Sequence, residues 1–147
     1  MNNIILNEID LLDIGYGLKI GLDKSGVWQV WAKNGRFDLK QATDFWRIVT
    51  LLERPYSEIK SIINEFTEQL GSEIRFPYYK VVSAGLTFEL DHWASLALSW
   101  FSYLEHDEQI MLVNLLDELE HSNWASQKSR HLARRCAKQI RAVNMDA

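Results

Sequence analysis

The sequence predicts an α+β fold, in which a small antiparallel sheet packs with helices. Apolar residues alternate with a period of two between Tyr16 and Leu39, and the period changes to that of a helix from about Thr43. Helical patterns then occupy the chain from Asp91 onward. We therefore expect an N-terminal meander and a later hairpin, packed with two central helices and a C-terminal three-helix subdomain.

The N-terminal segment, residues 2–14, fits two structures. Ile5, Ile9 and Leu12 have the spacing of one helix face, whereas residues 4–6 form an apolar run that suits a short strand. The pattern favours neither alternative, so both stay open.

Three strands are predicted next. Residues 16–22 alternate large apolar side chains with small or polar ones, as in a half-buried strand. A turn at residues 23–26 leads to a second strand over residues 27–33. Asn34 and Gly35 both tolerate a positive φ, which predicts a type I′ hairpin turn before the third strand. A three-stranded antiparallel meander results.

Two helices are expected in the centre of the chain. The first starts at about Thr43 and ends near Glu53, because Pro55 cannot continue a helix. Ser57 is expected to cap the second, and Gly71 to end it at the C′ position.

Strand-like alternation returns after the second helix. Residues 78–82 and residues 86–90 both alternate, and Ala84-Gly85 between them suits a turn. This pattern predicts the later hairpin.

The most regular helical pattern spans residues 91–104, with Asp91 at the predicted N-cap. Its large apolar residues fall at i, i+3, i+4, i+7, i+8 and i+11. They are Trp93, Leu96, Ala97, Trp100, Phe101 and Leu104. Two further helices are predicted over residues 107–120 and 124–143. The single predicted domain, residues 1–147, thus comprises a strand-rich part with two helices (1–90) and a helical part (91–147).

A short motif occurs twice in the helical part. Residues 89–95 (ELDHWAS) resemble residues 118–126 (ELEHSNWAS). The similarity is explained if the two copies simply start their helices in the same way. The alternative is that the two copies belong to a helical-repeat unit.

Composition favours a packed intracellular domain. Of 147 residues, 47% are hydrophobic, with six Trp and only two Pro, which argues against disorder. A single cysteine, Cys136, allows no internal disulfide and suits a reducing compartment. The N-terminus has no basic region, and no apolar run approaches the ~18 residues that span a bilayer. We expect a cytoplasmic protein without a membrane segment.

Charge is unevenly distributed around a net value of −4. Residues 123–147 contain six basic residues against one acidic residue, whereas the preceding residues contain ten basic and nineteen acidic ones. In the last predicted helix the basic side chains occupy one arc opposite the apolar face. They are Arg130, His131, Arg134, Arg135, Lys138 and Arg141. Three interpretations of this basic arc are open. It is a solvated helix face, it forms ion pairs with the acidic helix before it, or it binds a protein or nucleic acid.

Two Glu-x-x-His pairs have the spacing used in carboxylate-bridged metal sites. They are Glu89/His92 and Glu118/His121. The first pair begins in a predicted strand and no matching long helices accompany it, which favours surface charge over a metal site.

The other candidates for chemistry have structural explanations. His106, Asp107 and Glu108 could form an acid–base group, but acidic residues in a first helical turn also complement the helix dipole. Cys136 could be a reactive thiol beside arginines, but its position on an apolar stripe favours an inward-facing side chain. No phosphate-binding loop, nucleophile elbow or zinc spacing is present. We expect no catalytic residues, no metal and no cofactor.

Trp28 and Trp31 are three residues apart in a predicted strand, so they point to opposite faces of the sheet. The tryptophan on the face away from the core is either covered or available as an anchor for a partner.

These observations favour a non-enzymatic, cytoplasmic protein-binding module, for example an immunity- or antitoxin-type inhibitor that sequesters a basic macromolecule. The residues expected to attract that partner are acidic. They are Glu105, Asp107, Glu108, Asp117, Glu118 and Glu120.

Two alternatives remain. One is a nucleic-acid-binding regulator that uses the basic face of the last helix. Its contacts would be Arg130, Arg134, Arg135, Lys138 and Arg141. The other is an enzyme whose site is assembled from distant parts of the chain.

Overall fold

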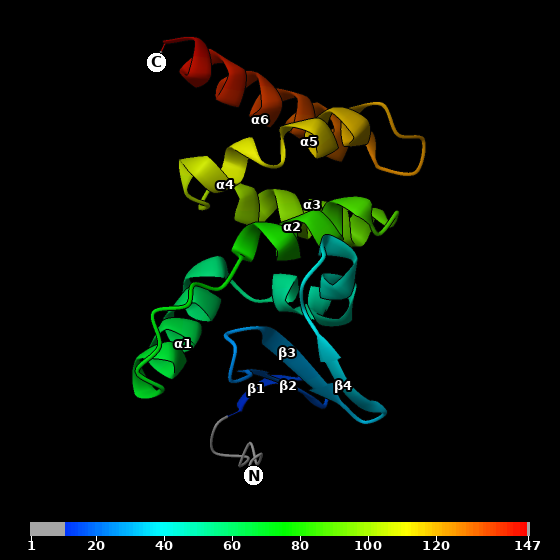
Figure 1. Cartoon of the computed structure of the whole chain (residues 1–147). Helices are drawn as coiled ribbons and strands as arrows, with labels where there is room; N and C mark the ends of the chain where they lie inside the picture. Colours follow the sequence, from blue (N-terminus) through cyan, green and yellow to red (C-terminus); the bar gives the residue numbers. More distant parts are fainter. Residues whose placement is uncertain (1–10, 147) are drawn as a thin grey trace.

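The computed structural model describes residues 11–146, and its helices stack in layers above a small sheet (Figure 1). In chain order the elements are β1 (Leu12–Gly15), β2 (Leu18–Leu22), β3 (Trp28–Ala32), β4 (Gly35–Asp38), the 3₁₀ helix η2 (Ala42–Glu53), α1 (Tyr56–Gln69), α2 (Tyr78–Thr87), α3 (Asp91–Phe101), α4 (His106–Ile110), α5 (Val113–Glu120) and α6 (Gln127–Asp146). The sheet and α6 lie at opposite ends of the stack. The predicted α+β class is confirmed.

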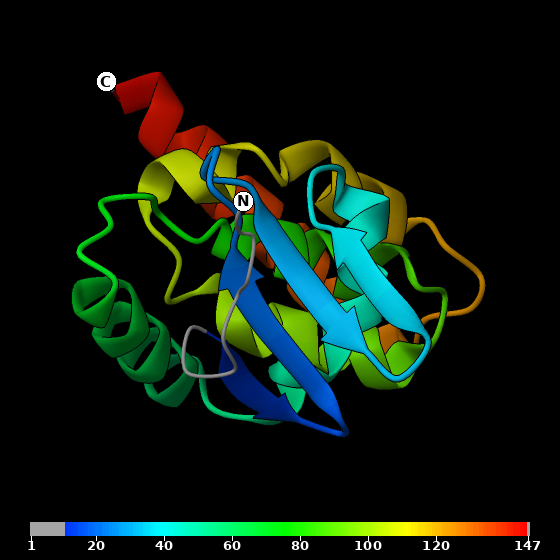
Figure 2. The ribbon, with the colours of Figure 1, turned by 60° about the horizontal axis from the view of Figure 1, so that its bottom comes forward.

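The sheet is a four-stranded antiparallel meander in the order β1-β2-β3-β4 (Figure 2). It has one strand more than predicted, because β1 occupies the end of the ambiguous N-terminal segment. Residues 2–10 of that segment lie outside the described residues. Gly15, Tyr16 and Gly17 all have positive φ values (91°, 58° and 76°), so they form the turn between β1 and β2. The second strand therefore begins at Leu18 rather than at Tyr16.

The hairpin between β3 and β4 is confirmed, but its predicted turn is wrong. Ala32 pairs with Gly35, so the two-residue loop is Lys33-Asn34 instead of Asn34-Gly35. Neither loop residue has the positive φ that a type I′ turn requires. Gly35 has the positive φ, 141°, as the first residue of β4.

The two tryptophans of β3 point to opposite faces of the sheet, as predicted. Trp28 is buried under the helices, where its ring meets the edge of Phe76 at 5.1 Å and its Nε1 donates to Arg75 O at 3.2 Å. Trp31 is half-buried on the other face, with the Arg36 guanidinium 5.0 Å from its ring centroid. Trp31 is therefore largely covered rather than freely exposed.

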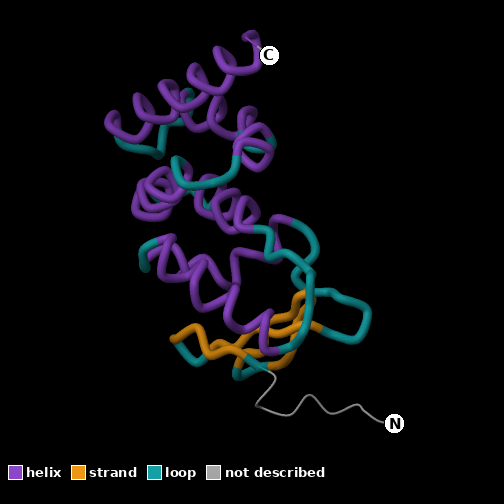
Figure 3. Tube along the Cα trace, turned by 90° about the vertical axis from the view of Figure 1, so that its left-hand side faces the viewer, coloured by secondary structure: helices purple, strands orange, loops and turns teal. Residues whose placement is uncertain are grey.

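The predicted later hairpin is wrong, because residues 78–87 form the helix α2. Six consecutive residues, Val81 to Leu86, are buried. A helix enclosed on nearly all sides has no polar face, so its sequence lacks the helical period and its β-branched residues suggest strands. All strands in the described chain lie at one end of the molecule (Figure 3). The helical part consequently begins at residue 42, not at residue 91.

Gly85 lies at a close crossing of α2 with η2 and α3 rather than in a turn. A Cβ atom at this position would lie 2.6 Å from Leu52 Cδ1, 2.8 Å from Ala97 Cβ and 2.9 Å from Trp93 O. Only glycine fits these distances, so the absence of a side chain lets the three helices approach one another.

Both predicted central helices are present, but their type, exposure and capping differ in part from the prediction. The first, η2, is a 3₁₀ helix in which Trp46 is 41% exposed. Ser57 does not cap α1, because the helix already begins at Tyr56, after Pro55. Gly71 has φ 67° and follows the end of α1, as predicted.

The helix predicted from Asp91 is confirmed as α3, and its Trp100 is 2% exposed with Nε1 donating to Arg54 O at 2.9 Å. Asp91 is not its N-cap, since Leu90 occupies that position. The Asp91 carboxylate instead accepts the Ser126 N–H at 2.9 Å. Asp91 thus joins the start of α3 to the start of α6.

The helix predicted over residues 107–120 is divided into α4 and α5. Leu112, at the break, is 1% exposed and belongs to the core. The last helix begins at Gln127, three residues later than predicted, because Ser126 caps it: Ser126 Oγ accepts the Ser129 N–H at 3.1 Å.

The repeated motif connects equivalent helices. Its first copy joins α2 to α3 and its second joins α5 to α6, and α2 contacts α5 while α3 contacts α6. The motif therefore marks two stacked helical hairpins, which the Asp91–Ser126 hydrogen bond ties together.

We expect Gly85→Ala to lower the free energy of unfolding by roughly 1–3 kcal/mol, the usual cost of an extra methyl group in a packed core. Urea denaturation followed by circular dichroism would measure the change. Ser95→Ala, at an exposed position of α3, is the control and should leave stability nearly unchanged. Equal stability of Gly85→Ala and the wild type would contradict the close helix crossing.

Asp91→Ala should lower the free energy of unfolding at pH 7 by about 1.5–3 kcal/mol, the usual contribution of a hydrogen bond to a charged group. Burial opposes ionisation of Asp91, but hydrogen bonds from Ser126 and Ser129 outweigh it and hold the pKa below the ordinary value of 3.8. The stabilisation is therefore complete above pH 3.8 and disappears as the pH falls through the lower folded-state pKa.

Urea titrations between pH 7 and pH 2 would show the difference between wild type and Asp91→Ala shrinking at low pH. Asp91→Asn keeps an acceptor oxygen but does not titrate, so it separates the hydrogen bond from the charge. A difference that stays constant with pH would refute this role of the Asp91 carboxylate.

Candidate functional site

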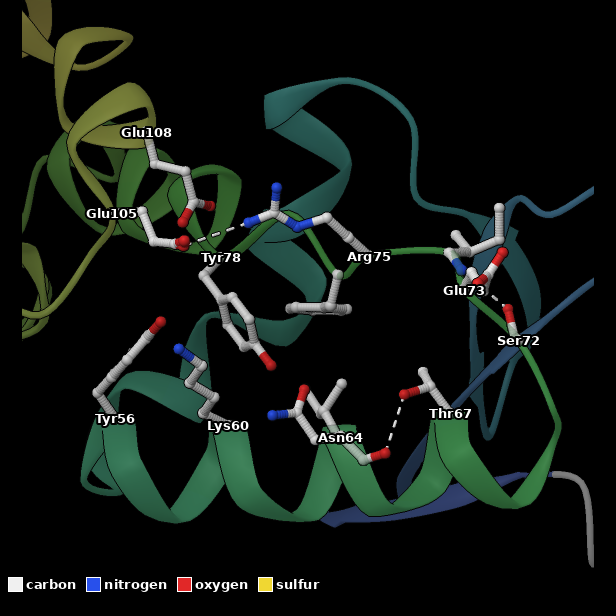
Figure 4. A pocket seen from close by; sticks show the side chains of 13 residues that line it. Tyr56, Lys60, Asn64, Thr67, Ser72, Glu73, Arg75, Tyr78, Glu105 and Glu108 are labelled. Carbon is white, nitrogen blue, oxygen red and sulfur yellow. Dashed lines mark hydrogen bonds and ion pairs between the residues drawn. The ribbon is translucent and has the colours of Figure 1, made fainter.

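A cavity of about 170 Å³ lies between α1, residues 72–76, the first turn of α2 and the start of α4 (Figure 4). It lies where α1 diverges from the stacked helices, on the side of the molecule that also carries α4 (Figure 1). Its walls combine aromatic rings with charged and amide side chains.

One wall is a polar face of α1. Tyr56, Lys60, Asn64 and Thr67 recur three or four residues apart, so they follow one side of the helix beside its buried apolar stripe. The Lys60 ammonium lies 5.7 Å from the Tyr56 ring centroid. Within residues 11–146 it has no ion pair or hydrogen bond. The Thr67 hydroxyl, in contrast, donates to the backbone oxygen of Asn64 at 3.0 Å.

Tyr78, the first residue of α2, forms the aromatic side of the cavity. Its ring packs edge-on against Tyr56 at 5.3 Å and Phe76 at 5.1 Å, and the residue is 7% exposed. The hydroxyl is buried and has no hydrogen-bond partner among the described residues. Figure 4 shows it directed between Lys60 and Asn64.

Both tyrosines are protonated at neutral pH, because the ordinary tyrosine pKa is about 10, and burial shifts the pKa further in that direction. It raises the pKa of Tyr56 to about 12, with a smaller contribution from the negative charges of Glu108 and Glu105. It also strongly raises the pKa of Tyr78, to which Tyr56 and Glu108 contribute further. Each hydroxyl is therefore available as a hydrogen-bond donor.

Two carboxylates at the start of α4 complete the cavity, and both have partners. Glu105 Oε2 lies 3.5 Å from Arg75 Nη2, and Glu108 Oε2 accepts the Tyr79 N–H at 3.1 Å. Burial raises the pKa of Glu108. These contacts hold α4 against the segment that precedes α2.

A second hollow, of about 350 Å³, adjoins the first, and Tyr56 lines both. Leu96 and Trp100 of α3 form part of its wall. Tyr103, 67% exposed, stands at this second hollow with its ring stacked on Tyr56 at 6.1 Å and an interplanar angle of 9°. The stack of Tyr56 and Tyr103 places an exposed aromatic surface next to Glu105.

The six acidic residues predicted to bind a partner do not form one surface. Glu105, Asp107 and Glu108 gather at the start of α4, beside the cavity, whereas the other three belong to α5. Asp107 and Glu108 also lie in the first turn of α4, where negative charge complements the helix dipole.

The basic face of α6 is partly paired with α5. Arg141 Nη1 donates to Asp117 Oδ1 at 3.0 Å, and Arg134 Nε lies 3.7 Å from Glu120 Oε2. The hydrogen bond from Arg141, followed by the effect of its charge, lowers the pKa of Asp117 although burial opposes it. Internal pairing therefore accounts for two of the predicted basic contacts. Arg135 and Lys138 are exposed on α6, while Arg130 is partly buried.

Neither Glu-x-x-His pair is assembled. His92 Nε2 lies 3.1 Å from Glu53 Oε2, and Glu53 Oε1 accepts the Tyr16 hydroxyl at 2.7 Å. His121 Nδ1 lies 2.8 Å from the backbone oxygen of Asp117. Within residues 11–146 no three His, Cys, Asp or Glu side chains gather closely enough to hold a metal ion.

Cys136 points inward from α6, as predicted, and is 8% exposed. Burial raises the pKa of its thiol more than the nearby Arg135 charge lowers it. A neutral buried thiol is a poor nucleophile, so Cys136 functions in packing.

No described helix is both long and apolar enough to cross a membrane. No protein-family model, curated protein or solved structure matches this chain.

Lys60, Asn64, Arg75 and Tyr78 were not among the residues predicted from the sequence. The spacing of Lys60 and Asn64 beside an apolar helical stripe was an available signal, but polar residues at that spacing occur on most solvated helices. Tyr78 was assigned to a strand, so its proximity to α1 could not be inferred.

Tyr78→Phe should leave the free energy of unfolding unchanged or raise it by up to about 1–3 kcal/mol, because it removes a buried hydroxyl without a partner. Chemical denaturation of the purified chain would measure this. Trp100→Phe is the matched control: it removes the hydrogen bond to Arg54 O and should destabilise the protein. Destabilisation by Tyr78→Phe of the same size as the control would mean that the Tyr78 hydroxyl is bonded.

Proposed function

We propose that this protein is a non-enzymatic, cytoplasmic protein-binding module, which binds a basic partner at the surface formed by the Tyr56–Tyr103 stack and the start of α4. An immunity- or antitoxin-type inhibitor is one example of such a protein. The observation on which the proposal rests is Tyr103. This large aromatic side chain is 67% exposed beside a hollow and is held in place by its stack on Tyr56.

The physical properties of this surface suit a protein partner. Tyrosine loses little conformational entropy on binding and is enriched among the residues that dominate interface energies. The adjoining hollow of about 350 Å³ can accept a side chain from the partner. Glu105, Asp107 and Glu108 add negative charge beside it, which attracts a cationic protein and orients its approach.

The acidic residues of α5 are assigned a smaller part in this proposal. Asp117 and Glu120 are already neutralised by Arg141 and Arg134 of α6. Ion pairs of this kind must be broken before the carboxylates can bind another cation. Glu118 of α5 is exposed and has no ion pair within residues 11–146. The proposed contact surface uses the three residues that lie beside the Tyr56–Tyr103 stack, which are Glu105, Asp107 and Glu108 at the start of α4.

The same pairing counts against the alternative of nucleic-acid binding. Arg134 and Arg141 are exposed but paired, so Arg135 and Lys138 remain as the exposed cations of the predicted set that have no ion pair in the described chain. Fewer phosphate contacts give a weaker affinity and a smaller dependence on salt.

We expect Tyr103→Ala to weaken partner binding about 30-fold, the factor that corresponds to a hot spot of about 2 kcal/mol. The tagged wild type, mixed with nuclease-treated lysate of its native cell, should retain a basic protein in stoichiometric amount. The Tyr103→Ala variant should lose that protein, and Glu105→Gln should weaken its retention most at low salt.

The double variant Arg135→Ala/Lys138→Ala is the matched control on α6 and should retain the partner. Loss of binding in this control, together with sensitivity to nuclease, would favour the nucleic-acid alternative. A protein retained equally by the wild type and Tyr103→Ala would refute the proposed surface.

A further inference from the structure

The cavity beside α1 contains hydrogen-bond donors that lack acceptors. The Tyr78 hydroxyl is buried without a partner, and the residue is 7% exposed. Lys60 projects from α1 toward the same space and, among the described residues, faces no carboxylate within ion-pair distance. The Asn64 side chain, one turn further along α1, is exposed and has no hydrogen-bond partner in the described chain. Of these three donors only the Tyr78 hydroxyl is buried, so it is the one that water does not satisfy and that gains most from an acceptor.

Two of the three carboxylates that line the cavity are engaged by other groups. Glu105 lies against Arg75, and Glu108 accepts the Tyr79 N–H. The third, Glu73, is exposed. The Tyr78 hydroxyl therefore remains open beside carboxylates that bind elsewhere, and an incoming acceptor would complement it.

We propose that this cavity binds a small oxyanion, the carboxylate or phosphate group of a small molecule, between the Tyr78 hydroxyl, the Lys60 ammonium and the Asn64 amide. This site adjoins the proposed protein-binding surface, with Tyr56, Glu105 and Glu108 bordering both, but Tyr103 does not line it. The binding step involves no chemical change in the ligand.

The open donors, rather than the net charge of the lining, favour an anion: Lys60 and Arg75 stand against Glu73, Glu105 and Glu108, but the Tyr78 hydroxyl and the Lys60 ammonium have no acceptor in the described chain. The positive charge of Lys60 lies inside the cavity, where an ammonium or guanidinium group would be repelled. A protonated tyrosine donates a hydrogen bond readily to an oxyanion, and bonds to a charged acceptor are roughly twice as strong as bonds between neutral groups. Glu73, the remaining carboxylate, lies beside Ser72 and Thr67, at the other end of the cavity from Lys60 (Figure 4).

The size of the cavity limits the ligand. A volume of about 170 Å³ accommodates inorganic phosphate or a short carboxylic acid but is below the range of about 300–1,000 Å³ that holds drug-sized molecules. The aromatic rings of Tyr56, Phe76 and Tyr78 provide an apolar wall for the part of the ligand that carries the oxyanion.

Thermal unfolding in the presence of anions tests the proposal. The wild type is melted at pH 7 in increasing inorganic phosphate or sodium acetate, with sodium chloride at equal ionic strength as the reference. An anion bound by the native state alone raises the melting temperature with its concentration. We expect a rise of about 3–6 °C at roughly ten times the dissociation constant.

Tyr78→Phe and Lys60→Gln should each reduce this rise by at least half, measured against their own melts in chloride. Lys138→Gln, which removes the same charge from the exposed face of α6, should retain the full rise. A response to phosphate alone identifies a phosphoryl ligand, and a response to acetate alone identifies a carboxylate.

Two results would overturn the proposal. One is the absence of any rise with either anion relative to chloride. The other is an equal rise in the wild type, Tyr78→Phe and Lys60→Gln, since a general effect of the salt on stability would then explain it. Neither result bears on partner capture by Tyr103, so the two proposals fail separately.

Discussion

The enclosure of α2 is the constraint on which the rest of the structure depends. Its middle is buried on all sides, and at Gly85 it approaches η2 and α3 more closely than any larger residue would allow. With α2 fixed in this way, its first residues, Tyr78 and Tyr79, are held against α1 and α4. At its other end, Thr87 accepts the Trp46 indole N–H at 3.1 Å. The cavity and the base of the helical stack therefore depend on the same packing.

Electrostatics divide the molecule into two parts. At the end formed by α5 and α6, acidic and basic side chains neutralise each other across the helix pair. At the start of α4, carboxylates remain near exposed aromatic rings, and Glu105 and Glu108 also fasten the segment before α2. Exposed ion pairs add little stability, so this distribution matters mainly for which surface attracts a partner.

The elements that were predicted correctly depend on interactions between residues close together in the sequence. The β3–β4 hairpin, the helix from Asp91, the end of α1 at Gly71 and the opposite faces of Trp28 and Trp31 were all found in this way. Each depends on backbone conformation or on a one-sided apolar pattern over a few residues. The inward position of Cys136 followed from the same kind of pattern.

The α+β class, most helix positions and the charge asymmetry could be predicted from the sequence, because they depend on residue types and on neighbours along the chain. The helix at residues 78–87 could not be predicted, since burial on every side removes the periodicity that distinguishes helix from strand. Tertiary packing also determines which charges pair and that Lys60, Asn64 and Tyr78 share a cavity. Contacts between distant segments follow from how the helices stack, and no local pattern encodes that arrangement.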